Sequence, residues 1–512
     1  MIPKRVLRLF IRCTLPLLLI GCVLRADVRL PGLFSDHMVL QQGGTVPVWG
    51  WADDGEAVKV TFRGKTVKTS ATGGKWLLKL PRQKAGGPFT LVVEGRNRIE
   101  LRNVLVGEVW ICSGQSNMEW PLARSFEPQA AIEASANPNL RLFTVPKLKA
   151  DAPVDDVKAS WQECSPQTVK DFSAVAYFFG RDLQKARGVP VGLIHTSWGG
   201  SPAEVWMRHE VLARNPEYKQ DILDPYPEQE RKYKEALAKW EKETEELKKQ
   251  GKEQKNGAPW PTWKPSELYH GMIAPLIPYA LRGAIWYQGE SNAGRARQYR
   301  TLFPNMIQNW RDDWRQGDFT FLLVQLAPWD KGRQRSPEEI TRKPEDSDWP
   351  ELREAQLMTT KALPKVGMAV ITDVGDKDDI HPPKKEPVGA RLALLARAIA
   401  HREKVVCYGP LYQGMKIKKD KVILTFDHVG GGLEARGGHL RGFAIAGDDR
   451  KFVWAIAGIE GKKVVVSSPM VPKPVAVRYG WADYPVVNLF NREGLPASPF
   501  RTDTFERAEA KP

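Results

Sequence analysis

Residues 109–122 have the sequence VWICSGQSNMEWPL. An apolar run ends there in the turn Gly114-Gln115-Ser116, so a polar serine stands where a buried strand has just reached the surface. Near-continuous apolar strands are typical of parallel sheets covered on both faces, and ligands bind such sheets at the carboxyl ends of the strands. A turn serine without a chemical role is the commoner case, so Ser116 needs support from the rest of the chain.

Five further apolar runs repeat this pattern between residues 104 and 405: LRLFTV (140–145), PVGLIHTS (190–197), RGAIWYQG (282–289), TFLLVQL (320–326) and VGMAVITD (366–373). Helical segments lie between them, and the clearest extends from an N-cap at Ser173 to a stop at Gly188. Apolar runs that alternate with helices predict an α/β domain with a parallel sheet over residues 104–405.

Both flanks of this domain have the sequence pattern of antiparallel strands. Residues 27–103 contain short alternating stretches separated by Gly, Asp and Pro turns, which predicts an N-terminal β-sandwich domain. Strand patterns return after residue 405, which predicts a β-rich C-terminal region over residues 406–512.

Residues 209–266 interrupt the α/β pattern with a highly charged helical insertion. One stripe of its helix carries Tyr233, Leu237, Trp240, Thr244 and Leu247. Two interpretations are open. The helix is either a lid or partner-binding element, or a solvated insertion that this stripe packs onto the surface, which is the commoner outcome.

The first 26 residues predict an export signal, because a basic start precedes the apolar stretch CTLPLLLIGCVL. Cleavage after Gly21 would leave Cys22 as the lipid-bearing residue of a lipoprotein, whereas cleavage after Ala26 would leave a chain without an anchor. Both alternatives predict an exported protein that is periplasmic, anchored to the outer membrane or secreted. No later run is long and apolar enough to span a membrane.

The composition gives little support for nucleic-acid or metal binding. The formal net charge is +16, but five basic residues lie in the leader and the others are scattered among acidic residues. Beyond the leader only Cys112, Cys164 and Cys407 remain, an odd number at wide spacing that fits neither a disulfide framework nor a metal site.

Polar residues gather directly after four of the apolar runs, at Gly114–Asn117, Ser197–Ser201, Tyr287–Asn292 and Asp373–His381. They supply a hydroxyl, a glycine pair, side-chain amides, carboxylates and an imidazole. Acyl transfer needs this set, because a serine nucleophile requires a base within hydrogen-bond reach and the oxyanion requires N–H donors. Each feature alone is more often structural, but their joint occurrence at successive strand ends favours a serine esterase.

Among the eight histidines, His381 is the favoured base because it alone combines a strand end, a carboxylate cluster and a following helix. A metal ion held by Asp376, Asp378 and Asp379 is disfavoured against a solvated loop with one member oriented toward His381. The chain also lacks a dinucleotide-binding fingerprint, a phosphate-binding loop and a His-Glu-x-x-His motif. No metal and no organic cofactor are therefore expected.

At these residues the sequence resembles the bacterial sialate O-acetylesterase family, a branch of the SGNH-type hydrolases. Four ordered blocks carry the resemblance: GEVWICSGQSNMEWPL (107–122), TSWGGSPAEVWM (196–207), GAIWYQGESNA (283–293) and DIHPPKKEPVGARLA (379–393). The similarity covers nearly the whole mature chain. It implies a three-layer SGNH-type α/β hydrolase core with an appended N-terminal β-domain, and hydrolysis of O-acetyl groups on sugars without a cofactor.

Residue by residue, the resemblance implies that Ser116 is the nucleophile and His381 the general base. It implies an oxyanion hole built from the N–H groups of Ser116 and Gly200 and the side chain of Gln288. Supporting roles fall to Asn117, Glu290 and Asn292.

The third member of the triad stays open. Asp378, three residues before the histidine, is favoured on spacing, and Asp379 is the alternative. A Ser-His dyad, with a backbone carbonyl orienting the imidazole, is a further possibility.

The expected function is an exported carbohydrate O-acetylesterase with sialic acid O-acetyl groups as substrate. The alternatives are an esterase for acetylxylan or another acetylated glycan, a non-catalytic glycan-binding protein, and a structural surface lipoprotein. Aromatic side chains that would stack on sugar rings at the rim, or else lie in the core, are Trp198, Trp206, Tyr287, Trp260 and Trp263.

Overall fold

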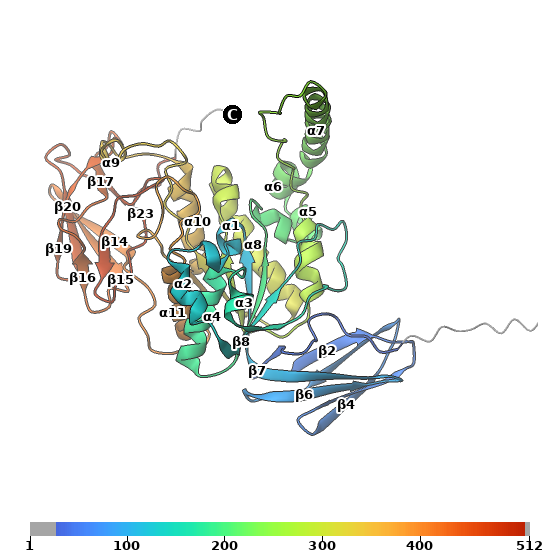
Figure 1. Cartoon of the computed structure of the whole chain (residues 1–512). Coiled ribbons are helices and arrows are strands. Elements are labelled where there is room, and N and C mark those ends of the chain that lie inside the picture. The colour runs from blue at the N-terminus through green and yellow to red at the C-terminus, as the bar shows by residue number, and fades with distance from the viewer. Residues whose placement is uncertain (1–26, 507–512) are drawn as a thin grey trace, which may run out of the picture.

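The computed structural model describes residues 27–506, and its centre is a mixed sheet (Figure 1). The strand order is β13 (Val366–Ala369), β12 (Thr320–Val324), β11 (Gly283–Tyr287), β7 (Arg98–Gly114), β10 (Val191–Ser197), β8 (Asn137–Thr144) and β9 (Gln162–Cys164). Neighbouring strands are parallel except β9, which is antiparallel to β8. The predicted α/β class is confirmed, with one antiparallel edge strand added to the parallel sheet.

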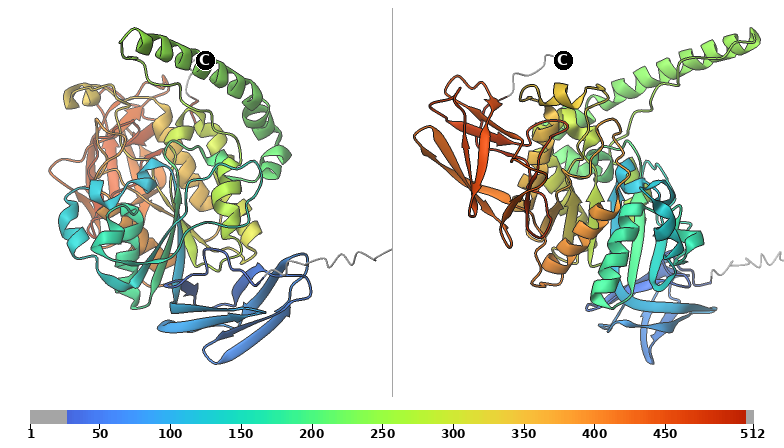
Figure 2. Two further views of the ribbon diagram at one scale, coloured as in Figure 1. Left: turned by 45° about the vertical axis from the view of Figure 1, so that its right-hand side comes forward. Right: turned by 60° about the vertical axis from the view of Figure 1, so that its left-hand side comes forward.

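Helices cover both faces of this sheet (Figure 2). On one face, α4 (Ala174–Arg187) and α11 (Glu386–Ile399) share a buried core with Trp110 and Cys112 of β7. On the other face, α8 (Ala296–Trp314) and α10 (Asp348–Ala362) share a core with Val109 and Ile111, which alternate with Trp110 and Cys112 along β7. Successive side chains of a strand point to opposite faces, so a strand buried on both faces reads as a continuous apolar run.

The ends of α4 follow the local sequence. The hydroxyl of Ser173 accepts a hydrogen bond from the N–H of Ala176 at 3.1 Å. At the other end, Gly188 adopts the left-handed conformation, with φ of 62°, where glycine is the least strained residue. The predicted start and stop of this helix are confirmed.

Strand β7 belongs to two sheets at once, because its first half pairs with β1 and β6 and its second half with β10 and β11. The strands of the N-terminal segment are β1 (Val39–Gln41), β2 (Val46–Trp51), β3 (Ala57–Phe62), β4 (Lys65–Ser70), β5 (Lys75–Leu80) and β6 (Gly86–Glu94). The boundary expected between residues 103 and 104 therefore falls inside a continuous strand.

The C-terminal segment has a buried core of its own. One sheet contains β14 (Leu411–Lys418), β15 (Lys421–Asp427), β20 (Lys463–Ser467) and β19 (Ile456–Glu460), and a second contains β18 (Val453–Trp454), β17 (Phe443–Ala446), β21 (Ala476–Tyr479) and β23 (Phe500–Arg501). A two-stranded pair is formed by β16 (Leu433–Ala435) and β22 (Leu489–Asn491).

The shorter helices all precede the C-terminal segment. They are α1 (Ser116–Glu119), α2 (Pro128–Glu133), α3 (Pro166–Val169), α5 (His209–Arg214), α6 (Pro216–Tyr218) and α9 (Pro337–Thr341).

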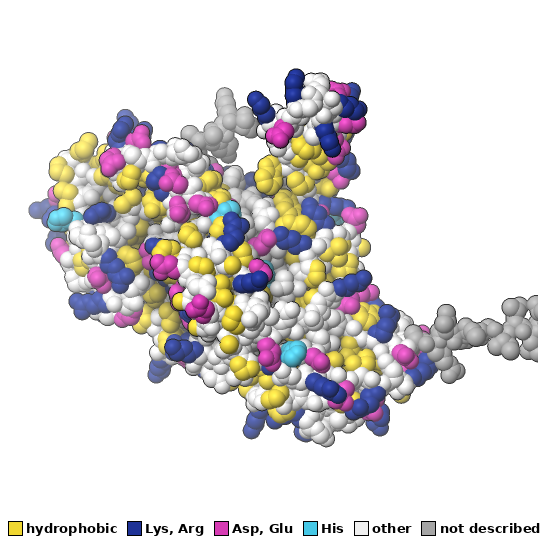
Figure 3. Space-filling model, viewed as in Figure 1, with side chains coloured by type: hydrophobic (Ala, Val, Ile, Leu, Met, Phe, Trp, Pro, Cys, Tyr) yellow, Lys and Arg dark blue, Asp and Glu magenta, His cyan; other side chains and the backbone are white. Residues whose placement is uncertain are grey.

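Within the insertion, α7 (Tyr226–Lys249) projects away from the body of the molecule and has no buried residue (Figures 1 and 2). Its stripe is half-buried, and the indole of Trp240 donates to the carbonyl of Asn256 on the returning segment at 2.8 Å. Figure 3 shows acidic and basic side chains interspersed on this helix and over the rest of the viewed face.

The expected export signal and Cys22 lie outside the described residues. Within residues 27–506, no helix is long and apolar enough to cross a membrane. The thiols of Cys112, Cys164 and Cys407 are free.

A buried guanidinium ties the central sheet to the C-terminal segment. Arg353 of α10, which is 1% exposed, donates hydrogen bonds to the carbonyls of Leu326, Ala327, Ala482 and Asp483 at 2.6–3.2 Å. No side chain without several donors can satisfy these carbonyls together, so Arg353 fixes how the two segments meet.

We predict that Arg353→Met lowers the free energy of unfolding by about 3 kcal/mol or more, because a buried polar group left without its partner costs about 1–3 kcal/mol. Chemical denaturation measures this loss. The matched control is Lys361→Met, which removes an exposed cation from the same helix and is expected to have little effect. Equal stability of the two variants would contradict the assignment.

Candidate active site

Ser116 owes its position to the glycine that ends β7. Gly114 has φ of 139°, and a Cβ there would lie 2.2 Å from the carbonyl oxygen of Tyr287 on β11. Only glycine permits this close approach. The next residue, Gln115, donates its N–H to the same carbonyl at 3.0 Å, and Ser116 then begins α1. The serine therefore stands at the carboxyl end of an interior strand of the sheet.

His381 lies in the loop that follows the edge strand β13, and its side chain meets Ser116. The Nε2 atom of His381 lies 2.8 Å from the Oγ atom of Ser116, and both residues are half-buried. The imidazole stacks on the indole of Trp120, with ring centroids 5.1 Å apart and an angle of 18° between the planes. The structure thus brings together the nucleophile and base expected from the sequence.

Burial lowers the pKa of His381 below its ordinary value, although the nearby Asp379 carboxylate acts in the opposite direction. The neighbouring cations of Lys385 and Arg124 lower this pKa further. At neutral pH the imidazole is therefore uncharged, which is the form that accepts a proton from a serine hydroxyl.

Of the two candidate acids, Asp379 faces the histidine. Its Oδ1 atom lies 3.4 Å from Nδ1 of His381 and accepts the N–H of the same residue at 2.8 Å. The carboxylate of Asp378 pairs with Lys377 and its side chain is 61% exposed. The Asp376 carboxylate accepts the N–H groups of both following aspartates, at 2.9 and 3.1 Å, and so shapes this turn. The favoured choice of Asp378 disagrees with this geometry, because the structure places the alternative, Asp379, beside His381.

The Gly199-Gly200 loop lies against Ser116. A Cβ on Gly199 would lie 3.3 Å from Cβ of Ser116, and the N–H of Gly199 donates to the Glu119 carboxylate at 2.7 Å. Gly200 is exposed, with φ of 76°, and its N–H has no acceptor among the described residues. Ser116 occupies the first helical position of α1, where an N–H has no partner within its own helix. These two N–H groups remain available to a ligand.

Gln288 does not fit the expected role of oxyanion donor. It is fully buried, and its amide nitrogen donates to Oδ1 of Asn292 at 2.6 Å and to the carbonyl of Ser201 at 3.3 Å. Its Oε1 atom accepts from the hydroxyl of Tyr299 at 2.9 Å. Since both amide protons are committed inside the protein, the side chain joins two loops instead of presenting a donor to Ser116.

Asn292 extends the same connection. Its Oδ1 atom also accepts the N–H of Ala203 at 2.9 Å, and its amide nitrogen donates to Glu204 at 2.9 Å. The expected support by Asn292 therefore takes the form of a buried link between the loops that follow β10 and β11.

The sequence places Gln115 directly before the serine but assigns it no role. Its side chain is buried, and Oε1 accepts the N–H groups of Gly289 and Ser291, each at 3.4 Å. The hydroxyl of Ser291 in turn donates to the carbonyl of Gly200 at 2.9 Å. Gln115 Nε2 donates to no other described residue, so its amide protons are uncommitted at this edge.

A buried polar chain lies next to the Ser116–His381 pair. Asn117 is fully buried, and its amide nitrogen donates to Glu290 at 2.7 Å and to the carbonyl of Ile380 at 3.0 Å. Its Oδ1 atom accepts a hydrogen bond from the ammonium of Lys385. Nothing in the sequence singles out Lys385, because it stands second in the pair Lys384-Lys385.

The expected aromatic rim is only partly present. Trp206 and Tyr287 are fully buried in the core, whereas Trp260 is 92% exposed. Trp198 and Trp263 are half-buried and pack edge to face, with ring centroids 5.7 Å apart. These last two are the members of the set that remain candidates for contact with a sugar.

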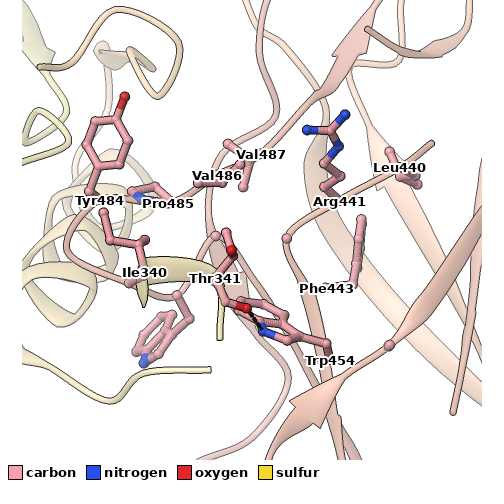
Figure 4. A pocket seen from close by; sticks show the side chains of 15 residues that line it. Ile340, Thr341, Leu440, Arg441, Phe443, Trp454, Tyr484, Pro485, Val486 and Val487 are labelled. Atoms are coloured by element: carbon pink, nitrogen blue, oxygen red, sulfur yellow. Dashed lines mark hydrogen bonds between the residues drawn. The ribbon is translucent and has the colours of Figure 1, made fainter. Parts of the chain in front are cut away.

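Elsewhere in the molecule, a cavity of about 270 Å³ lies between α9, which contributes Ile340 and Thr341, and the C-terminal segment (Figure 4). The indole of Trp454 donates to the carbonyl of Thr341 across it at 2.6 Å. None of the residues that line this cavity belongs to the Ser116 site. Within residues 27–506, no three His, Cys, Asp or Glu side chains are grouped so that they could hold a metal ion.

Comparison with known proteins gives a consistent result. The family model described as "Carbohydrate esterase, sialic acid-specific acetylesterase" matches residues 106–252 and 253–394. A crystal structure of a carbohydrate acetylesterase from Xanthomonas citri is 39% identical and covers 94% of this chain and 100% of its own, with a TM-score of 0.80.

Curated sialate O-acetylesterases are similar over nearly their whole length. The protein from Homo sapiens is 28% identical and the one from Mus musculus 29%, and each match covers 92% of this chain. The matches cover 92% and 94% of those relatives, respectively. The chain therefore belongs to the carbohydrate esterase family of sialic acid-specific acetylesterases.

Proposed function

We propose that Ser116 is the nucleophile of a carbohydrate O-acetylesterase and that His381 is its general base. The observation that carries this proposal is the 2.8 Å contact between Ser116 Oγ and His381 Nε2. Asp379 orients the imidazole through Nδ1. A binding protein or a structural lipoprotein would have no need for this pair, and family membership supports an enzyme that hydrolyses O-acetyl groups on carbohydrates.

The mechanism follows from these positions. Nε2 of His381 takes the proton of Ser116 as Oγ attacks the acetyl carbonyl, and the tetrahedral intermediate collapses when the sugar oxygen leaves with that proton. Water then attacks the acetyl-serine with His381 again acting as base, which releases acetate and restores the hydroxyl. No step requires a metal or an organic cofactor.

The oxyanion is held by the N–H groups of Ser116 and Gly200. For a side-chain donor we prefer Gln115 over Gln288, because the Gln288 amide protons are both committed to Asn292 and Ser201. Asn117 and Glu290 support the arrangement from the protein interior, and Asn292 supports it by joining the loops after β10 and β11.

O-acetylated sialic acid is the first candidate substrate, supported by the description of the matching family and by the curated relatives. Acetylxylan or another acetylated glycan is the second, because the relative at 39% identity is described more broadly as a carbohydrate acetylesterase. Gly200 is exposed to solvent, so the loop that contains it could be approached by either sialic acid or a larger glycan.

We further propose that the protein is exported, on the evidence of its first 26 residues, and that its core is of the SGNH type. The proposed division has an N-terminal β-sandwich over residues 27–103, an esterase domain over 104–405 with the insertion 209–266, and a β-rich region over 406–512. The C-terminal segment has a buried core of its own, which supports a separate C-terminal unit, although Cys407 and Tyr408 still pack against the core of the α/β domain.

We predict that Ser116→Ala lowers kcat for acetate release by about 10⁴–10⁶-fold, the range expected when a serine nucleophile is removed. Acetate is measured from 9-O-acetylated sialoglycan and from acetylated xylan in parallel. Ser70→Ala, a substitution at an exposed position on β4, is the control and keeps full activity. Release that is unaffected by Ser116→Ala would refute the proposal, while the substrate that is hydrolysed identifies the sugar.

We predict that the midpoint of the acid limb in the pH profile of kcat/KM lies below pH 6.5. The pKa of His381 is lowered from that value, and the imidazole is neutral above its pKa.

Asp379 raises the pKa of His381, so Asp379→Asn should move the acid limb to still lower pH and reduce kcat by about 10²-fold or more.

The matched control for this experiment is Asp378→Asn, which changes the adjacent, exposed carboxylate. It is expected to leave both kcat and the position of the acid limb unchanged. If Asp378→Asn had the large effect and Asp379→Asn had none, Asp378 would be the acid of the triad.

A further inference from the structure

Lys385 is a buried cation with an uncommon environment. The residue is 1% exposed and lies four positions after His381, at the start of α11. Its ammonium lies 5.4 Å from the centre of the Tyr287 ring and 5.7 Å from that of Trp120. The adjacent Lys384 is exposed. Burying a charge is costly unless it is paired, so this position calls for a compensating role.

Among the residues that the structure describes, the hydrogen-bond acceptor of this ammonium is Oδ1 of Asn117. Because a lysine ammonium can only donate, it fixes which end of the Asn117 amide faces it. The amide nitrogen must then point away, toward the Glu290 carboxylate and the carbonyl of Ile380, to which it donates at 2.7 and 3.0 Å. The orientation of one buried amide is thus set by a cation on one side and an anion on the other.

This amide joins the two halves of the proposed catalytic pair. Asn117 directly follows Ser116 on α1, and Ile380 directly precedes His381 in the loop after β13. The hydrogen bond from Asn117 to Ile380 therefore holds the backbone of the base against the backbone of the nucleophile. If the amide were reversed, a carbonyl oxygen would face the carbonyl of Ile380 and the link would be lost.

We propose that Lys385 is a positioning residue that locks the Asn117 amide and thereby sets the geometry of the Ser116–His381 pair. This inference rests on the proposed function and extends it to a residue in the interior of the site.

The surrounding charges are consistent with an electrostatic part of this role. The charged groups that influence His381 are Asp379, Lys385 and Arg124. Glu290 and Asp379 act on Lys385, and the buried hydroxyl of Tyr287 has no hydrogen-bond partner among residues 27–506. Burial lowers the pKa of Lys385 to about 7, so the ammonium is still protonated over the acid limb below pH 6.5.

The test compares Lys385→Met with Lys384→Met, which removes the neighbouring exposed cation. Lys385→Met is expected to lower kcat by about 10–100-fold with KM nearly unchanged, because a small displacement of a reacting group costs up to about 10²-fold. The acid limb of kcat/KM should move to higher pH, since a cation that opposes protonation of His381 has been removed. Lys384→Met should match the wild type, and Lys385→Arg should restore the position of the limb.

A purely structural lysine would change stability without moving the acid limb, and that result would overturn the inference. If Lys385→Met does not fold, Lys385→Gln takes its place, since it keeps a donor to Asn117 without the charge and should give the same upward shift. If the wild type and Ser116→Ala released acetate at the same rate, the proposed function would be refuted instead. A wild-type pH profile and kcat in Lys385→Met, with Ser116 still essential, would refute only the role of Lys385.

Discussion

The proposed chemistry depends on a single hydrogen-bonded contact, the 2.8 Å approach of Ser116 Oγ to His381 Nε2. The two residues are 265 positions apart, and the strands that precede them are not neighbours, because β12 and β11 lie between β13 and β7. A parallel sheet brings the carboxyl ends of all its strands to one edge. The loop after β13 must therefore extend along that edge to reach the serine. Hydrogen bonds to the rest of the protein are needed to hold the loop in one conformation.

Those attachments are buried and polar. The Ile380 carbonyl is held by Asn117, the Lys377 carbonyl by the N–H of Asp330, and the amide of Asn117 by Lys385. The loops after β10 and β11 are joined in a similar way by Gln288 and Asn292. Buried polar groups stabilise one arrangement because every alternative leaves some of them without partners. The interior of the site therefore specifies the geometry of the Ser116–His381 pair.

Much of the framework could be predicted from the sequence, because strands buried on both faces give near-continuous apolar runs and a helix such as α4 carries its own start and stop residues. Ser116 and His381 could be singled out because each stands at a strand end beside complementary chemistry. The details of the site could not be predicted. Spacing does not reveal that the turn shaped by Asp376 points Asp379, and not Asp378, toward the imidazole. Nor does it reveal that the Gln288 amide is committed internally, or which lysine of the pair 384–385 is buried.

The most direct test of the proposed nucleophile is to label the protein with a serine-reactive phosphonate and locate the adduct by peptide mass spectrometry. The structure predicts one adduct, on Ser116, and a large loss of labelling when His381 is replaced by alanine, because the hydroxyl then has no base. Labelling at another serine, or acetate release that continues after Ser116 is fully labelled, would contradict the assignment of Ser116 and His381 as the reacting pair.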